Sequence, residues 1–447
     1  MSLQDRIDQF ESPLAMLRAS GIGDPFPYPL DYTNWRDEQK AWTTTAVLFD
    51  QSFHMTDLFI TGPDVYKLLS DTSVNSYATF GPGKAKQYVA VNEEGYVVGD
   101  NILVGLGPDE VTLAGFAHSL NWLEYHAATG GYDVEISRDR NSQGEPGSKR
   151  LYRYELEGPV AWKILEAAAG HELDHIKFFN TAKITIAGHQ VWALNHTMGG
   201  VPGAESTGLE LWGPTEEGPA VTEAILAAGE QFGLKRGGAL AYASTTAESG
   251  WVGAIVPAVY TSPSLRAYRE WLPDDSLEAF AINGLHGSHN PDTVEGYYLN
   301  PWELGYNRVV KFDHDFIGRS ALEKMQNENP RRKVWLKWNG EDTQRALVAS
   351  ELDAPDRPKA LPFPMGISWD EVRVGDRLIG RTQQTGYTVN IGGFSSNGSV
   401  DEEYAVDGTE VEIVWGDHDG GESNPSTPRH APIRIRATVH TSSPVDA

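Results

Sequence analysis

Residues 170–175 read GHELDH, in which His171, Glu172 and His175 match the H-E-x-x-H pattern of zinc-dependent hydrolases. On a helix, positions i and i+4 share one face, so two imidazoles could bind one zinc ion while the glutamate activates its water. The preceding run, PVAWKILEAAA (159–169), predicts a helix, and a glycine directly after such a run is typical of a helix end. We therefore expect HELDH to be an exposed connection and predict no metal site, with a zinc hydrolase as the least favoured alternative.

The charge of the chain restricts its partners. The sequence has 62 acidic and 36 basic residues, a formal net charge of −26, and no cysteine. A surface this acidic repels phosphate backbones and anionic lipids, so we expect neither nucleic acid nor membrane as a partner, and an anionic ligand would need a local basic patch. The absence of cysteine excludes disulfides, thiolate metal sites and cysteine nucleophiles. The N-terminal residues lack the apolar run of a signal peptide, and a cytoplasmic location is expected.

The elements that would position a site follow from the periodicity of the sequence. A chain of 447 residues predicts two or three domains. Over residues 1–332 helical and strand patterns alternate, which predicts an α+β core with a polar linker near 137–150. From residue 333 to 447 short strands separated by Gly and Asp turns predict a C-terminal β-barrel.

Several local predictions concern the segments near candidate side chains. The spacing predicts three strands over 87–115 and a hairpin over 183–197. Residues 47–62 read as paired strands, and residues 176–179 read as a further strand. The oligomeric state is left open.

A set of longer stretches, in order along most of the chain, resembles the aminomethyltransferase (glycine cleavage T-protein) family. Within that family the stretches are most similar to the tetrahydrofolate-dependent O-demethylases of vanillate and syringate. The stretches include YPLDYTNWRDEQKAW (28–42), VLFDQSFHM (47–55), KAKQYV (84–89), NWLEYHAATGGYDV (121–134), GLELWGP (208–214), AYASTTAESGW (241–251) and VKFDHDFIGRSALE (310–323).

The resemblance implies a fold and a reaction. The fold is a two-lobed α+β core around a folate channel, closed on one side by a C-terminal β-barrel. The reaction moves the methyl group of a methoxylated aromatic compound to tetrahydrofolate, which gives a phenol and 5-methyltetrahydrofolate. Two alternatives stay open: a relative with a non-aromatic donor, and a folate-binding protein without catalytic activity.

Four polar residues are implied to lie on the substrate side. A departing phenolate needs a proton, and a tyrosine suits this role because its reference pKa of about 10 is close to that of a phenol. Tyr242 matches the catalytic tyrosine of the demethylases and Tyr28 a second active-site tyrosine, although most tyrosines are packing residues. Gln51 and His54 match substrate-binding positions. On a regular strand they would face opposite ways, so a turn at 52–53 is needed.

The remaining candidates are implied to contact the folate or to set specificity. Glu210 matches a carboxylate that would accept the adjacent donors of the pterin edge, with Glu205 as its alternative. Trp251 and Phe178 match positions that pack along the folate rings. Phe116 stands where the vanillate-type members carry an arginine. A phenylalanine cannot pair with a carboxylate, so an acidic substrate would have to hold its charge elsewhere.

Overall fold

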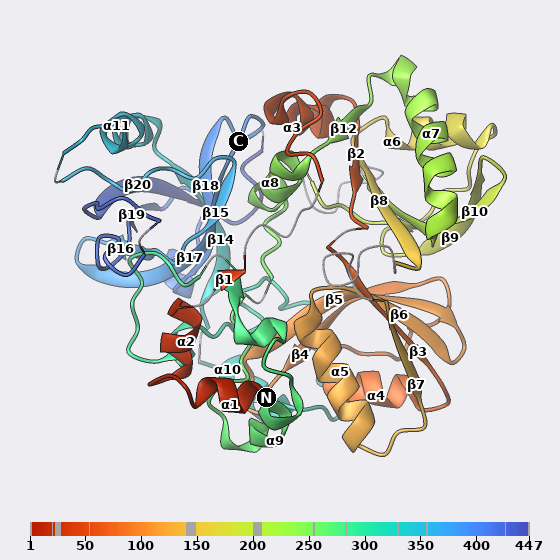
Figure 1. Cartoon of the computed structure of the whole chain (residues 1–447), viewed down its shortest axis with the longest axis horizontal. Helices are drawn as coiled ribbons and strands as arrows, with labels where there is room; N and C mark the ends of the chain where they lie inside the picture. The colour runs from red at the N-terminus through yellow and green to blue at the C-terminus, as the bar shows by residue number, and fades with distance from the viewer. Residues whose placement is uncertain are drawn as a thin grey trace.

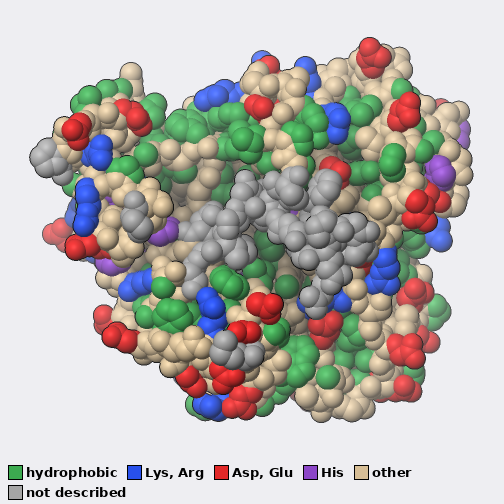
Figure 2. Space-filling model, in the orientation of Figure 1, with side chains coloured by type: hydrophobic (Ala, Val, Ile, Leu, Met, Phe, Trp, Pro, Cys, Tyr) green, Lys and Arg blue, Asp and Glu red, His purple; other side chains and the backbone are tan. Residues whose placement is uncertain are grey.

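The computed structural model shows three β-sheet units arranged around a central region (Figure 1). The structure describes residues 2–19, 21–22, 28–52, 54–139, 149–199, 208–253, 255–282, 284–328, 330–354, 356–424 and 426–445. Acidic side chains are spread over all three parts of the face in Figure 2. No helix in these ranges is both long and apolar enough to cross a membrane.

The first unit is a five-stranded antiparallel sheet, and the prediction of three strands over 87–115 is confirmed. Its strands, in spatial order, are β4 (Ala85–Val91), β5 (Val97–Gly107), β6 (Glu110–Gly115), β3 (Thr56–Thr61) and β7 (Glu135–Asp139). Helices α4 (Val65–Thr72) and α5 (Ala117–Thr129) pack on it, since Leu69 and Trp122 belong to the same buried cluster as Leu58. The cluster extends to α1 (Leu3–Ile7), α2 (Pro13–Ala19), α9 (Arg266–Trp271), α10 (Arg319–Met325) and β13 (Ala281–Ile282), which pairs with β1 (Gly21–Ile22).

The second unit is a six-stranded sheet with helices on both faces. Its order is β12 (Lys235–Gly237), β2 (Val47–Asp50), β8 (Leu151–Glu157), β11 (Gly208–Pro214), β10 (His189–Asn195) and β9 (Thr181–Ile186). Helices α6 (Ala161–Ala169) and α7 (Gly218–Gly229) cover its outer face (Figure 1). The predicted hairpin over 183–197 is confirmed as the antiparallel pair β9–β10.

The inner face of this sheet is polar and nevertheless buried. Successive side chains of a strand point to opposite faces, and on β8 Tyr154 and Leu156 join the apolar cluster under the helices. The alternate residues Arg153, Glu155 and Glu157 therefore face inward, and their exposed fractions are only 1%, 0% and 1%. Charged groups at this depth require partners or a ligand.

Two helices cover this inner face. They are α3 (Trp35–Thr44) and α8 (Ala239–Ser249), and Trp42, Phe49 and Tyr242 form one buried cluster there. Helix α8 also contacts the C-terminal unit, because the Trp335 Nε1 atom donates to the carbonyl of Glu248 at 3.2 Å.

The third unit is the predicted C-terminal barrel, which is confirmed. Six strands close on themselves because β17 pairs with both β16 and β18, and β15 extends the sheet beside β17. The strands are β14 (Arg332–Trp338), β15 (Met365–Ile367), β16 (Glu371–Val374), β17 (Arg377–Thr388), β18 (Gly393–Val400), β19 (Glu410–Trp415) and β20 (Ile433–His440). Helix α11 (Gly340–Ser350) packs beside β20. The predicted α+β fold class with a C-terminal β-barrel is therefore confirmed.

Two local predictions were wrong, and a third falls mostly outside the described residues. Residues 47–62 do not form paired strands: β2 lies in the six-stranded sheet and β3 in the five-stranded one, so the chain crosses between lobes at residues 51–55. Residues 176–179 form no strand, and Phe179 has a φ of +55°, which no extended strand allows. Residues 137–139 of the predicted linker belong to β7, and residues 140–148 lie outside the described ranges.

Candidate active site

The centre of the candidate site is the contact between Tyr242 and His54. The Tyr242 hydroxyl lies 3.2 Å from the Nε2 atom of His54, and the two rings meet edge to face. Helix α8 presents the tyrosine, which also packs against Phe49 of β2 with ring centroids 5.3 Å apart. His54 follows β2 and lies beside Tyr242 of α8. The strand and the helix therefore bring the imidazole and the phenol together.

The surroundings fix the protonation of this pair. Burial raises the pKa of Tyr242 well above its usual value, and the neighbouring Tyr28 and Glu155 raise it further. Burial lowers the pKa of His54 to about 3, with Lys149 acting in the same direction. Near neutral pH a protonated phenol therefore faces a neutral imidazole, which is the arrangement of a proton donor beside a group that can accept and return a proton.

Gln51 adds an unsatisfied amide. Its side chain is 1% exposed, and within the described ranges neither its oxygen nor its nitrogen has a hydrogen-bond partner. Its backbone N–H donates to the carbonyl of Arg153 at 2.9 Å, which fixes it beside β8. Buried amides are normally paired, so this one is available to a ligand.

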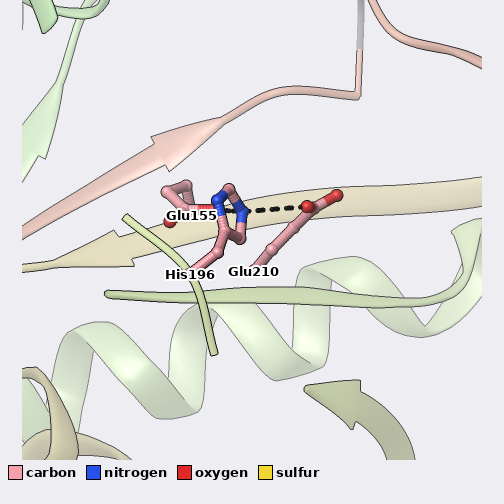
Figure 3. Close-up of side chains that lie close together, drawn as sticks. All are labelled: Glu155, His196 and Glu210. Carbon is pink, nitrogen blue, oxygen red and sulfur yellow. Dashed lines mark hydrogen bonds and ion pairs between the residues drawn. The ribbon is translucent and has the colours of Figure 1, made fainter. Parts of the chain in front are cut away.

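A buried ion network occupies the polar face of β8. The guanidinium of Arg153 pairs with Asp57 of the five-stranded sheet and with Glu210 of β11, and it therefore joins the two lobes. Lys149 donates to the same Asp57 at 2.6 Å. His196 lies between two carboxylates, with its Nε2 atom 3.0 Å from Glu210 and 3.2 Å from Glu155 (Figure 3).

The charges in this network follow from the contacts. Burial opposes ionisation of Glu210, but Arg153 and His196 lower its pKa to about 2. Burial likewise opposes charge on His196, yet Glu155 and Glu210 raise its pKa well above the usual value. Burial and the neighbouring Glu155 raise the pKa of Glu157. The face thus combines an ionised Glu210, a protonated His196 and a protonated Glu157.

Ligand atoms of Glu155, His196 and Glu210 lie within 4.8 Å of one another, a spacing that could also hold a metal ion. A metal would have to displace the proton of His196 and compete with Arg153 for Glu210, because metal ligands must be deprotonated. Without a metal, the protonated His196 interacts with both carboxylates, through a hydrogen bond with Glu210 and an ion pair with Glu155 (Figure 3). We therefore treat the cluster as a hydrogen-bonded network.

A second group of candidates lies near the C-terminal end of α8. The rings of Trp251 and Phe116 are stacked, with centroids 6.0 Å apart and planes 12° from parallel. The Nε1 atom of Trp251 donates to Asp100 at 3.0 Å, and Tyr306 donates to the same carboxylate at 2.7 Å. Trp251 is thus held in a fixed orientation.

The structure does not bring every candidate together. Tyr28, Gln51, His54, Glu210 and Tyr242 line the buried face between β2, β8 and α8. Phe178, in contrast, is 45% exposed on the loop before β9, and its ring contacts Phe179 at 4.9 Å. Glu205 lies outside the described residues.

The interpretation of GHELDH as a helix end is confirmed. Helix α6 ends at Ala169, and Gly170 caps it with a left-handed φ of +78°. His171, Glu172 and His175 follow as exposed residues without helical structure.

Sequence reasoning missed the network of Arg153, Glu155, Glu157 and His196. The signal was present in YRYELEG (152–158), where charged residues alternate with Tyr and Leu. Such alternation usually marks a strand with one solvated face. The burial of the charged face comes from α8 and the opposite lobe, which no local pattern reveals.

The neutral state of His54 predicts a pH dependence of stability. Its pKa is about 3 in the folded protein against 6.5 for a free histidine, so below pH 6.5 only the unfolded chain binds the proton. At pH 5 this favours the unfolded state by about 2 kcal/mol, and the loss grows until the pH reaches about 3.

Urea unfolding at pH 7 and pH 5 tests this prediction. The His54→Gln variant should lose about 2 kcal/mol less than the parent between these pH values, because contributions of other histidines cancel in the comparison. Equal losses in both proteins would show that His54 is protonated in the folded state.

Comparison with known proteins agrees with this fold. Residues 16–254 match the GCVT N-terminal domain. The crystal structure of the glycine cleavage system aminomethyltransferase T from Bartonella henselae superimposes with a TM-score of 0.61, covering 96% of each chain at 18% identity, which shows a shared fold.

Curated relatives extend over almost the whole chain. Syringate O-demethylase from Sphingobium sp. strain SYK-6 is 42% identical over 98% of this chain and 95% of its own length. Sesamin methylene transferase from Sinomonas sp. is 27% identical over 92% and 89%, and aminomethyltransferase from Lysinibacillus sphaericus is 25% identical over 86% of each. The fold is therefore that of the glycine cleavage aminomethyltransferases. This chain belongs to the GCVT family, as its sequence indicated.

Proposed function

We propose that this protein is a tetrahydrofolate-dependent O-demethylase that acts on a methoxylated aromatic compound. The observation that carries the proposal is the buried Tyr242–His54 pair, which supplies a protonated phenol where a departing phenolate would need one. The high identity to a syringate O-demethylase supports the same reaction class.

The residues of the site have separable roles in this proposal. Bound tetrahydrofolate would supply the amine that accepts the methyl group. Tyr242 would give its proton to the departing phenolate oxygen, and His54 would hold the tyrosine hydroxyl in place and exchange protons with it. The proton displaced from the folate amine by the methyl group would restore the Tyr242 phenol, so that protons balance over the reaction. The ionised Glu210 would accept hydrogen bonds from the pterin.

The polar face of β8 suits a pterin. Both Glu210 oxygens already accept hydrogen bonds, from Arg153 and His196, yet each carboxylate offers about four lone-pair sites and can also receive the pterin donors. Glu155 contributes a second carboxyl group, which lies beside His196 and Glu157. Gln51 offers both a donor and an acceptor. We assign Glu210 as the clamp and the neighbouring carboxyls as its support.

Other assignments belong to the same proposal. Residues 1–332 bind folate and the aromatic donor, and residues 333–447 close one side. Tyr28 assists Tyr242, while Trp251 and Phe178 pack along the folate and Phe116 contacts the aromatic donor. The protein works in the cytoplasm on small molecules.

Turnover with a panel of methoxyarenes tests the proposal. Syringate, vanillate and neutral methoxyarenes are incubated with and without tetrahydrofolate, and phenol and 5-methyltetrahydrofolate are quantified by liquid chromatography. We expect equal amounts of both products, only when both substrates are present. Alanine at His171, Glu172 and His175 serves as the matched control and should leave turnover largely intact.

The same assay separates the alternatives. Methyl transfer only from non-aromatic donors would indicate a different donor class within the family. Folate binding without transfer from any donor would indicate a non-catalytic folate-binding protein. Either result contradicts the proposed reaction.

A further inference from the structure

Lys333 is a partly buried cation without a protein counter-ion. It is the second residue of β14, and its side chain lies outside the barrel, since the alternate residues Val334 and Leu336 belong to the barrel core. Among the described residues its only close electrostatic partner is the ring of Trp335, 4.7 Å from the Nζ atom. No carboxylate of the described chain forms an ion pair with it.

Other cations at comparable depth are paired. Lys149 lies 2.6 Å from Asp57, Lys359 lies 2.7 Å from Asp417, and Arg381 lies 3.1 Å from Glu303. In a chain with 62 acidic residues, an ammonium without a carboxylate is therefore unusual. Burial alone lowers the pKa of Lys333 to about 8, which reflects the cost of an unpaired charge.

Two glycines make room for this side chain. A Cβ atom at Gly305 would lie 2.9 Å from the Cδ atom of Lys333. One at Gly250 would overlap the ring of Trp335 and would lie 3.0 Å from the Nζ atom of Lys333. Both glycines have positive φ angles, of +80° and +69°. The ammonium is thus directed to the point where α8 ends and Trp251 begins.

The position relates Lys333 to the candidate active site. Gly250 is the cap of the helix that carries Tyr242, eight residues earlier, which corresponds to about 12 Å along a helix. Trp251 follows Gly250 and stacks on Phe116, the residue that stands where related demethylases carry a cation. A ligand that lies along α8 from Tyr242 would bring its far end toward Lys333.

We propose that Lys333 binds the carboxylate of a ligand held along α8. The inference rests on the proposed function and deepens it by naming the residue that recognises the acid group. A ligand carboxylate would supply the counter-ion that the ammonium lacks among the described residues, through charge-assisted hydrogen bonds. Two ligands of the reaction carry such a group: an aromatic acid, and the glutamyl end of tetrahydrofolate.

The Lys333→Met variant tests the proposal, because methionine keeps the length of the side chain and removes the charge. Lys324→Met is the matched control, since the Lys324 side chain is 78% exposed and its ammonium pairs with the exposed Glu328. Dissociation constants are measured by calorimetry for syringate and its neutral aldehyde analogue, and for tetrahydrofolate and 6-methyltetrahydropterin, which lacks the glutamyl end. Thermal unfolding verifies that each variant is folded.

The two arms identify the carboxylate. A loss of about 10- to 100-fold in syringate affinity, with the aldehyde unchanged, assigns the site to the aromatic acid. The same loss for tetrahydrofolate, with the pterin unchanged, assigns it to the glutamyl end. In either case Lys333→Arg should retain most of the affinity.

Two results would overturn the proposal. One is unchanged affinity for all four ligands, and the other is an equal loss for charged and neutral ligands. The binding measurements need no turnover, so a failure of the demethylase reaction would be visible separately, as absence of product with the parent protein.

Discussion

Replacing Tyr242 with phenylalanine is expected to lower the turnover number by about 10²- to 10⁴-fold, the usual contribution of a positioned general acid. The ring would still pack against Phe49 and His54, so the fold and the affinity for both substrates should change little. The lost hydroxyl is the proton donor that the site presents beside His54. Without it, the phenolate must leave unprotonated.

Steady-state kinetics and folate titration measure this effect separately. Tyr404→Phe is the control, because Tyr404 packs against the barrel cluster and its hydroxyl accepts only from Arg377. A fall in turnover with unchanged folate affinity supports the proton-donor role. A change of less than about threefold would mean that Tyr242 is a packing residue, since that corresponds to less than 1 kcal/mol of barrier.

The second large effect is on stability. Arg153→Met is expected to lower the free energy of unfolding by about 3–5 kcal/mol, because it leaves buried charges without their partner. Asp57 would keep Lys149, but Glu210 would keep only His196. Since Arg153 pairs across the two lobes, the variant should also loosen their contact.

Denaturant unfolding at constant pH gives this free energy. Arg266→Met is the matched control: its pair with Glu270 is on the surface, with side chains 59% and 52% exposed, and surface pairs contribute about 0–1 kcal/mol. Adding Glu210→Gln to Arg153→Met should recover part of the loss, because it removes the carboxylate that has lost its guanidinium partner, whereas Asp57 keeps Lys149. A loss no larger than that of the control would contradict the buried network.

Predictions that depend on local chemistry were accurate. Gly170 ends α6 because glycine adopts a left-handed cap without steric cost. His171 and His175 therefore do not share a helical face, which the zinc motif would require. The closed barrel followed from short strands between Gly and Asp turns. The contact between His54 and Tyr242 agrees with the residues that the family resemblance singled out.

Predictions that depend on distant parts of the chain failed. The sequence suggests that residues 47–50 and 56–61 pair with each other. In the structure β2 pairs with β8 and β3 pairs with β6, in two different sheets. The local sequence does not specify which strands pair. From sequence alone, the charged face of β8 is expected to be exposed to solvent. In the structure α8, which lies more than eighty residues later in the chain, covers that face. The exposure of Phe178 also depends on tertiary structure, and its contact with the folate stays a prediction.

The central claim is that the methoxy carbon of an aromatic donor moves to tetrahydrofolate. The most direct measurement is single-turnover ¹³C NMR with a ¹³C-methoxy syringate, excess protein and tetrahydrofolate. The account predicts that the methoxy signal disappears as an N-methyl signal of 5-methyltetrahydrofolate appears with equal intensity. Appearance of labelled methanol or formaldehyde, with unmethylated folate, would contradict it.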